Sequence, residues 1–315
     1  QTNFDGRWTP RVTALFKVAK DNHIRVAFQT AYRFPTNQDQ YISLATGSGT
    51  LIGALPEFQS YYKLSTTLKG YTPESILKYR DPIQNPGGPS NTSMLVEYQY
   101  REVKPETVTS YEIGYKGIVL DKKLYIDAYA YYSRYKDFLA RQGLGQPKAP
   151  PSGTGTLTDL YSPFTTTNIS YAQNSTTDVK AYGWGVGVEY KIIKEYMLYG
   201  NVFSDNLKDV QTGFVTFFNA PKYRFNVGLR NDNVYKGAGF NVVAKWQDNN
   251  FYEGTFVTGT LPYFTWVDAQ ITYRPVGTKS TFRVGGTNIG NKYYRTGYGS
   301  PAVGGLYYVS YGFNL

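Results

Sequence analysis

The feature that most constrains this chain is a side-chain alternation of period two that persists over about ten to fourteen residues at a time. Between positions 181 and 192, the even positions are aromatic or aliphatic, whereas the odd positions carry alanine, glycine, glutamate or lysine. Positions 223–230 repeat the pattern, with Tyr, Phe, Val and Leu alternating with Arg, Asn and Gly. Because successive side chains of a β-strand point to opposite faces, this pattern predicts strands with one apolar and one polar face.

Extended along the chain, the alternation predicts eleven strands joined by two kinds of connection. The strands are expected near 8–18, 23–34, 107–119, 123–136, 179–193, 196–204, 221–232, 237–248, 262–274, 280–290 and 304–315. The short connections are 19–22, 120–122, 194–195, 233–236 and 275–279. The long connections are 35–106, 137–178, 205–220, 249–261 and 291–303. Short and long connections alternate throughout, as periplasmic turns and extracellular loops do in an outer-membrane barrel.

Strand length separates a membrane barrel from a soluble sandwich or propeller, whose strands average about five or six residues. The strands expected here are long enough to cross a bilayer when tilted, which takes about 9–11 residues. Aromatic residues make up 17% of the chain, including 32 Tyr, and they gather near strand ends as an aromatic girdle requires. The sequence therefore predicts an all-β fold, an antiparallel transmembrane β-barrel in the outer membrane.

Composition and residue spacing argue against several other classes of protein. The chain has no cysteine, which speaks against disulfide-stapled domains and cysteine metal sites. Its net charge of +10 is spread over alternating strands, so we expect no nucleic-acid partner. His23, the only histidine, lies at an expected turn without a carboxylate pair at metal-ligand spacing. The glycines at 183, 185 and 187 lie on a strand, so they do not form a nucleotide-binding loop. We expect no enzymatic activity, no metal site and no cofactor.

The number of strands has a consequence of its own. Single-chain bacterial barrels have an even number of strands, which leaves both chain ends in the periplasm. With eleven strands and the last one ending in the periplasm, residues 1–7 would lie on the extracellular side. We therefore expect either one further strand or an upstream part of the barrel.

Several segments, in order along the chain, are similar to motifs of the TonB-dependent receptors. The most specific is KPETVTSYEIGYK at 104–116, which resembles the strand opening of that family. The other segments are WTPRVTALFK (8–17), IRVAFQTAYRFPT (24–36), APKYRFNVGL (220–229), GTNIGNKYY (286–294) and LYYVSYGFNL (306–315). The chain departs from the family pattern at Leu315, where a terminal Phe is expected, and at Ser310, where outer-membrane assembly signals commonly have Gly. The resemblance runs from about residue 8 to the end.

This resemblance implies that residues 1–315 are the C-terminal portion, about half, of a 22-stranded barrel. The TonB box, the plug and the first strands would then lie upstream. It also implies energy-coupled uptake of a scarce nutrient, with outer-membrane lipid and a TonB-type complex as partners. Two alternatives stay open, a passive porin-like channel of about twelve strands and a surface barrel that docks a partner protein without transport. A surface lipoprotein is a further candidate partner, and the ligand is not identified by the sequence.

Two groups of residues are the candidate functional residues. The first consists of charges that share the polar parity of the strands, which predicts that they face the lumen. They are Arg11, Lys17, Arg25, Arg33, Glu112, Lys116, Asp127, Glu189, Lys191, Arg224, Arg230, Lys245, Asp268 and Arg283. The second consists of aromatic residues in the long connections 35–106 and 137–178, where ligand recognition is expected. The candidates in this group are Tyr61, Tyr62, Tyr71, Tyr161 and Phe164. Packing of the loops against each other is the alternative role for any one of them.

Overall fold

The computed structural model describes residues 4–47, 49–64, 68–254 and 257–314. Its main element is an eleven-stranded sheet in which strands that follow one another in the sheet are antiparallel. Its strands, in chain and spatial order, are β1 (Arg11–Ala19), β2 (Asn22–Arg33), β5 (Glu106–Val119), β6 (Leu124–Lys136), β9 (Val179–Lys191), β10 (Tyr196–Lys208), β12 (Arg224–Tyr235), β13 (Ala238–Gln247), β16 (Phe264–Tyr273), β17 (Ser280–Thr287) and β18 (Leu306–Phe313). This confirms the eleven expected strands and their antiparallel order.

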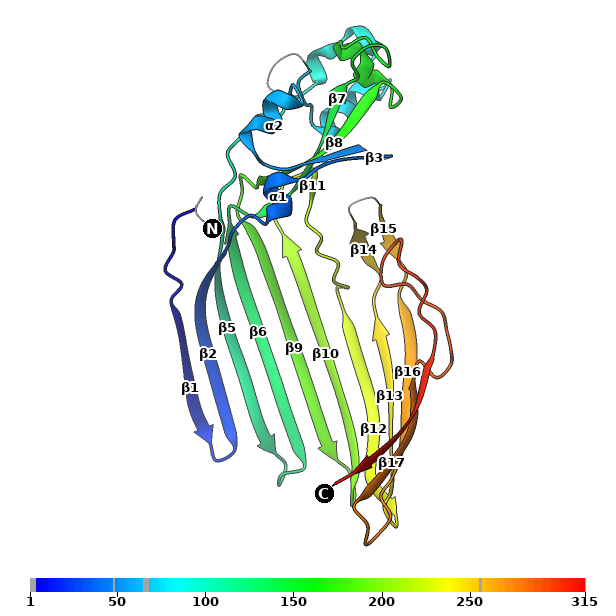
Figure 1. Ribbon diagram of the computed structural model, residues 1–315. Helices are drawn as coiled ribbons and strands as arrows, with labels where there is room; N and C mark the ends of the chain where they lie inside the picture. Colours follow the sequence, from blue (N-terminus) through cyan, green and yellow to red (C-terminus); the bar gives the residue numbers. More distant parts are fainter. Residues whose placement is uncertain (1–3, 48, 65–67, 255–256, 315) are drawn as a thin grey trace.

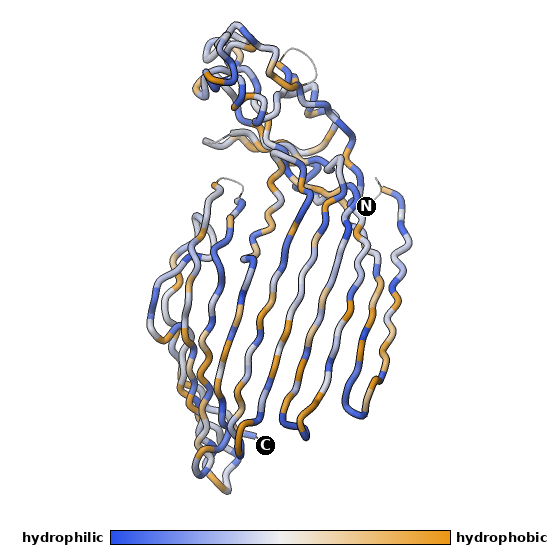
Figure 2. The backbone as a smooth tube through the Cα atoms, turned by 180° about the vertical axis from the view of Figure 1, so that it is seen from behind, coloured by the Kyte–Doolittle hydropathy of each residue, from blue (hydrophilic) through white to orange (hydrophobic). Residues whose placement is uncertain are grey.

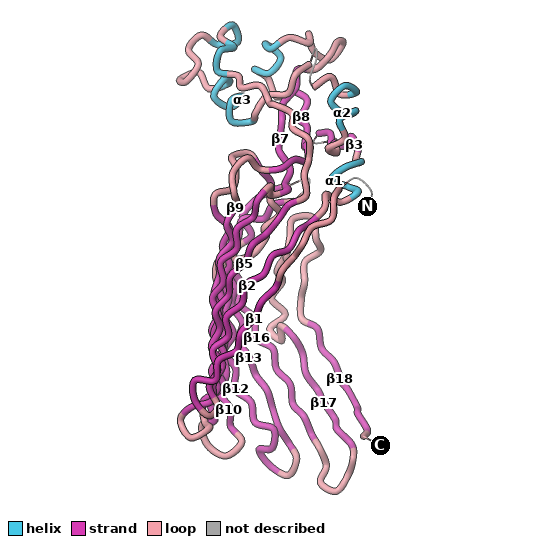
Figure 3. The backbone as a smooth tube through the Cα atoms, turned by 90° about the vertical axis from the view of Figure 1, so that its left-hand side faces the viewer, coloured by secondary structure: helices cyan, strands magenta, loops and turns pink. Residues whose placement is uncertain are grey.

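The sheet is curved and open (Figures 1 and 3), with β1 and β18 at its two ends. Among the described residues no pairing joins β1 to β18, so the barrel is not closed, as expected for half a barrel. Because eleven strands alternate in direction, β1 and β18 run the same way. A fully antiparallel barrel can therefore be closed only by adding an odd number of strands between these two edges.

The short connections gather at the end of the sheet that carries the C-terminus (Figure 1). One of the two tightest joins β12 to β13, where Tyr235 pairs with Ala238 across Lys236 and Gly237. Both turn residues have positive φ, 45° and 87°, as a two-residue hairpin of the primed type requires. A Cβ at Gly237 would lie 1.9 Å from the carbonyl oxygen of Arg274, so no larger residue fits there.

At the opposite end, the two longest connections fold into a separate layer (Figure 1), which we call the cap. The cap comprises the described residues of 34–105 and 137–178 together with β11 (Phe214–Val215). Its strands are β3 (Ser43–Thr46), β4 (Gly49–Ile52), β7 (Leu139–Pro147) and β8 (Thr166–Asn174), in the sheet order β11-β7-β8-β4-β3. Its helices are α1 (Asn37–Tyr41), α2 (Pro56–Tyr61) and α3 (Pro73–Arg80), with 3-10 turns η1 (Gly88–Ser90), η2 (Thr92–Met94) and η3 (Leu157–Tyr161). The sequence analysis expected loops in both stretches and no second sheet.

A smaller hairpin, β14 (Asn250–Glu253) and β15 (Thr258–Leu261), stands in the connection between β13 and β16. No helix in the described part of the chain is both long and apolar enough to cross a membrane.

The largest buried hydrophobic clusters lie in the cap rather than in the main sheet. One cluster consists of Ile52, Leu64, Leu144, Ile169 and Tyr171. A second consists of Tyr71, Ile76, Tyr79 and Leu160. Burial of a side chain of this size contributes about 1.5–3 kcal/mol, which makes the cap a folded unit rather than a set of loops. In the main sheet, by contrast, many large apolar side chains are exposed, for example Val309 and Ile271.

Candidate functional site

The cross-strand register divides the main sheet into a polar face and an apolar face. One row across the sheet pairs His23, Lys116, Asp127, Gly187, Asn201, Asn226 and Lys245 in succession. A row of the other face pairs Val12, Phe28, Tyr111, Tyr132 and Tyr182. Figure 2 shows the resulting alternation of hydrophilic and hydrophobic positions along the strands. We call the face of the first row the polar face and the face of the second row the apolar face.

Ten of the fourteen charges predicted to face the lumen form ion pairs with a neighbouring or nearby strand on the polar face. The pairs are Arg33–Glu106, Arg25–Glu112, Lys116–Asp127, Arg230–Glu189, Arg224–Asp205 and Lys245–Asp268. Their N–O distances, apart from that of Arg25–Glu112, run from 2.7 to 3.2 Å. Because most are partly exposed, each contributes only about 0–1 kcal/mol to stability. Their larger effect is to make this face a hydrophilic wall. Whether it faces a lumen stays a prediction.

Four other charges of the predicted set are on the same face. Arg11, Lys17, Lys191 and Arg283 occupy polar-face register positions, and no ion pair is found for them within the described residues. His23 lies between Lys17 and Lys116 in the register. The described part of the chain brings together no group of three His, Cys, Asp or Glu residues that could hold a metal ion.

Near the cap end of the polar face, Asp205 joins two strands that are not neighbours. Its carboxylate accepts a hydrogen bond from Tyr131 Oη at 2.6 Å and one from Arg224 Nη2 at 2.8 Å. The ring of Tyr131 lies over Gly183, where a Cβ would be 2.7 Å from the ring carbon Cε1. A Cβ at Gly185 would likewise be 2.6 Å from Cε1 of Tyr129, so these two glycines of β9 allow the close approach of tyrosine rings.

The five aromatic ligand candidates lie in the cap in two different environments. Tyr61 and Phe164 are exposed, with 75% and 85% of their surface accessible. Tyr62 packs against the first buried cluster, and its hydroxyl is 2.6 Å from Ser43 Oγ. Tyr71 is buried in the second cluster, and Tyr161 packs against it with its ring 5.4 Å from that of Tyr79. Tyr62, Tyr71 and Tyr161 thus help to build the cap, and direct contact of any of the five with a ligand stays a prediction.

A groove runs between the cap and the β14–β15 hairpin, with a volume of about 520 Å³. Its walls come from α3, β4, β7 and β8 on one side and from Gly254, Val257 and Thr258 on the other. Such a volume lies within the range of small-molecule sites, about 300–1,000 Å³. Arg80 is the one charged residue among its lining residues, and its guanidinium donates to the carbonyl oxygen of Leu160 and to Thr166 Oγ1, both at 2.7 Å. The groove therefore combines an apolar wall with a fixed cation.

A second arginine, Arg141, fixes the strands behind this groove. It is 6% exposed, and its side chain donates to the carbonyl oxygens of Ile52 (3.0 Å) and Ser170 (2.7 Å) and to Ser170 Oγ (2.9 Å). Burial lowers the pKa of Arg141 below its ordinary value, but the guanidinium stays charged at neutral pH. Burial also raises the pKa of the neighbouring Tyr98 and Tyr171 phenols, which therefore stay neutral. Neither Arg80 nor Arg141 is among the candidate residues predicted from the sequence.

The cap is joined to the sheet through a buried carboxylate at the first residue of β5. Glu106 Oε2 accepts from Arg33 Nη2 at 3.2 Å and from the backbone N–H of Leu139 at 2.7 Å. Arg33 also donates to the carbonyl oxygen of Leu139 at 3.1 Å. This carboxylate thus ties together the end of β2, the start of β5 and the first strand of the cap sheet. In the sequence, this carboxylate belongs to the Pro-Glu pair at 105–106, within the segment that resembles the family motif.

A family model described as TonB dependent receptor-like, beta-barrel, matches residues 1–289. The chain belongs to this TonB-dependent receptor family. The family consists of outer-membrane transport receptors rather than enzymes, which confirms the expected family and location. No match was found among curated protein sequences.

Solved structures of TonB-dependent receptors share the fold at low sequence identity. The siderophore receptor PirA from Acinetobacter baumannii is 15% identical with a TM-score of 0.59, and the match covers 98% of this chain and 41% of that one. The copper transporter OprC is 13% identical with a TM-score of 0.59, covering 96% and 39%. A mutant of the ferric enterobactin receptor PfeA from Pseudomonas aeruginosa is 13% identical with a TM-score of 0.57, covering 97% and 40%. The chain therefore spans about two-fifths of the length of these structures.

Proposed function

We propose that this chain forms the C-terminal barrel wall and a ligand-binding cap of a receptor for TonB-dependent uptake of a scarce nutrient. The groove between the cap and the β14–β15 hairpin carries the proposal, since it is a volume of ligand size at the end of the sheet that bears the cap. The polar face would line the lumen, and the cap would be extracellular. The plug, the TonB contact and an odd number of further strands would come from the rest of the receptor, giving 22 strands in all.

The ligand class proposed is a metal ion complex, and above all a ferric siderophore. PirA and PfeA are named for a siderophore and for ferric enterobactin, and OprC for copper. Ferric siderophores are commonly anionic and carry aromatic or amide groups, which suits an apolar wall with the cation Arg80 fixed beside it.

Leu77 offers a direct test, because it lines the groove and is largely exposed, so a larger side chain there blocks the groove without disturbing a core. We expect Leu77→Trp in the full-length receptor to lower uptake of radiolabelled ferric siderophore by about tenfold or more, the cost of blocking contacts worth roughly 1.4 kcal/mol. Ile83→Trp is the matched control, since Ile83 is exposed on the cap but does not line the groove.

Uptake is measured in cells on ferric enterobactin, a second ferric siderophore and copper, with and without TonB. Normal uptake of every probe by Leu77→Trp would contradict the groove as the binding site. Uptake that continues without TonB would favour the passive channel instead.

A docking role is the second candidate, and exposed apolar side chains on the cap favour it. Ile83 and Phe164 are 89% and 85% exposed, and Tyr61 is similarly open. Apolar side chains that are open to solvent on the cap are available for contact with another protein. A surface lipoprotein that bound the cap, with uptake of all three probes unchanged in a receptor deletion strain, would support docking over import.

A further inference from the structure

The apolar face of the main sheet carries a row of hydrogen-bond donors close to the cap. Thr30, Thr109, Arg134, Lys180 and Lys208 follow one another in register on β2, β5, β6, β9 and β10. They share the parity of Tyr132 and Tyr182, so they belong to the apolar face and not to the polar face. Three of the five are cations at directly opposed positions, where Cβ atoms of neighbouring strands are about 4.5–5.5 Å apart.

Like charges placed side by side destabilise a sheet, and this row is only partly compensated. Asp178 accepts from Arg134, and Asp209 is 2.6 Å from Lys180 Nζ. Lys208 lies over the ring of Tyr182 at 5.2 Å, and no ion pair is found for it among the described residues, since the adjacent Asp209 pairs with Lys180. Lys136, two residues beyond Arg134 on the same face, adds a fourth exposed cation. The row and its neighbours thus carry four cations and two carboxylates. This excess of positive charge suits the binding of an anion from outside the protein.

Directly below this row lies a row of aromatic side chains. Phe28, Tyr111, Tyr132 and Tyr182 pair in register on the same face, about 7 Å further along the strands. Aromatic rows of this kind mark the boundary between lipid headgroups and acyl chains. The donor row therefore lies at the level of the headgroups.

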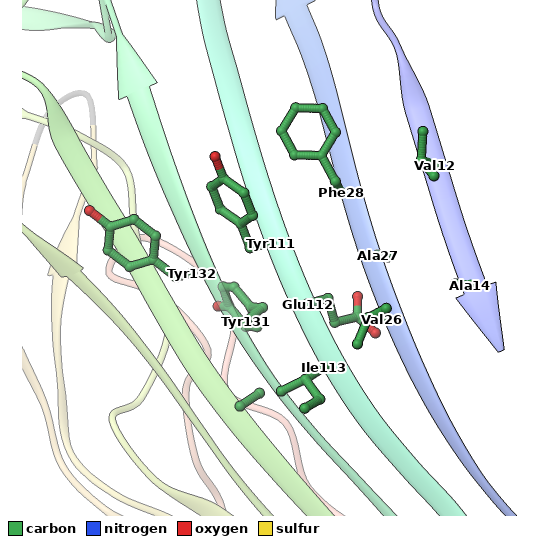
Figure 4. A pocket seen from close by; sticks show the side chains of 11 residues that line it. Val12, Ala14, Val26, Ala27, Phe28, Tyr111, Glu112, Ile113, Tyr131 and Tyr132 are labelled. Carbon is green, nitrogen blue, oxygen red and sulfur yellow. The ribbon is translucent and has the colours of Figure 1, made fainter. Parts of the chain in front are cut away.

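An apolar depression continues below the aromatic row (Figure 4). It has a volume of about 550 Å³ and includes Ala14, Val26, Ile113 and Ala130, under Phe28, Tyr111 and Tyr132. The residues Ala14, Val26, Ile113, Ala130 and Trp184 form one register row, in which the small side chains at 14 and 130 leave room beside the larger ones. β6 links the two features, because Tyr132 lines the depression and Arg134 lies two residues beyond it.

We propose that this outward surface binds one phosphorylated lipid of the outer leaflet. Arg134, Lys180 and Lys208 would hold its phosphate groups, the threonine hydroxyls would donate to its headgroup, and the depression would receive an acyl chain. Charge complementarity selects the phosphates, and the aromatic row sets the depth of the headgroup. This site is on the opposite side of the wall from the polar face, so it is independent of the nutrient groove.

The test uses the full-length receptor in detergent and bis-phosphorylated lipid A as the probe, with bound lipid measured by native mass spectrometry. The variant Arg134→Gln/Lys180→Gln/Lys208→Gln is expected to weaken binding on the order of tenfold or more, since each basic residue near an anionic lipid surface contributes severalfold. Dephosphorylated lipid A should bind the wild type more weakly than bis-phosphorylated lipid A does. It should bind the wild type and the triple variant equally well. Ala130→Trp, which fills the depression, should weaken both lipids.

A matched control removes three exposed lysines at the opposite end of the sheet, as Lys20→Gln/Lys123→Gln/Lys279→Gln. This control should bind lipid A as the wild type does. Folding of each variant is checked by its resistance to SDS without heating, and a variant that fails this check is replaced by the single changes Lys180→Gln and Lys208→Gln. The proposal would be overturned if the folded variants at positions 134, 180 and 208 bound lipid A as the wild type does. It would also be overturned if the control lost as much binding as they do. Nutrient uptake is not read in this experiment, so its outcome is separate from that of the proposed function.

Discussion

Arg141→Ala is expected to abolish ligand binding by the cap while the barrel still inserts into the outer membrane. The guanidinium donates three hydrogen bonds in the buried cap sheet, and its removal leaves the carbonyl oxygens of Ile52 and Ser170 without these donors. Hydrogen bonds from a charged group contribute about 1.5–3 kcal/mol each and are not additive, so we expect the cap to lose about 3–5 kcal/mol.

This effect is measured in the full-length receptor as loss of ferric siderophore binding and as faster cleavage of the cap by protease. Arg101→Ala is the matched control, because Arg101 is exposed in the other long connection of the cap. Arg141→Lys keeps the charge but loses the planar fork, so it should rescue only part of the binding. A cap as protease-resistant in Arg141→Ala as in the wild type would contradict the structural role of this arginine.

The second large effect is expected from a charge on the apolar face, at Val227→Arg. Val227 lies in mid-strand on β12, opposite Gly200 and Ala244, and is half exposed. If this face contacts lipid, an arginine near mid-membrane costs about 2–4 kcal/mol. We expect the free energy of unfolding of the receptor in lipid vesicles, measured in urea, to fall by that amount.

Asn226→Arg is the control for this change, since Asn226 is the preceding residue and belongs to the polar face, where its amide donates to Asn201 Oδ1. It should cost under about 1 kcal/mol, as exposed substitutions usually do. Equal losses in the two variants would mean that the two faces do not differ in their surroundings.

The strands of the main sheet could be predicted from the sequence because each one carries its own signal. In β9, alternation of Trp184 and Val186 with glycine fixes both the strand and its apolar face, and neighbouring strands follow through short turns. Strand ends were less well predicted, as on β10, which runs to Lys208 and not to residue 204. The extra residues include Asp205 and Asn206. These are two consecutive polar residues, so they interrupt the alternation from which the strand was predicted.

The cap could not be predicted in the same way because its sheet is assembled from distant pieces. β4 pairs with β8 across more than a hundred residues and in parallel, and β11 is only two residues long. β7 carries Arg141, Gln142 and Gln146, which are all buried, so period-two polarity is lost, and Arg141 and Gln146 donate to other segments. The sequence pattern also could not show that Tyr71 lies in the second buried cluster of the cap and that Tyr161 packs against it, and contact of either residue with a ligand stays a prediction.

The orientation of the wall can be measured most directly by single-cysteine labelling, since this chain has no cysteine of its own. Each of positions 225–230 on β12 is replaced in turn in the full-length receptor, labelled with a fluorophore and reconstituted in vesicles. We predict that quenchers attached to lipid chains act at 225, 227 and 229, whereas a water-soluble quencher acts at 226, 228 and 230. Quenching without this period of two, or with the two sets exchanged, would contradict the account of a membrane-spanning wall with its charged face turned inward.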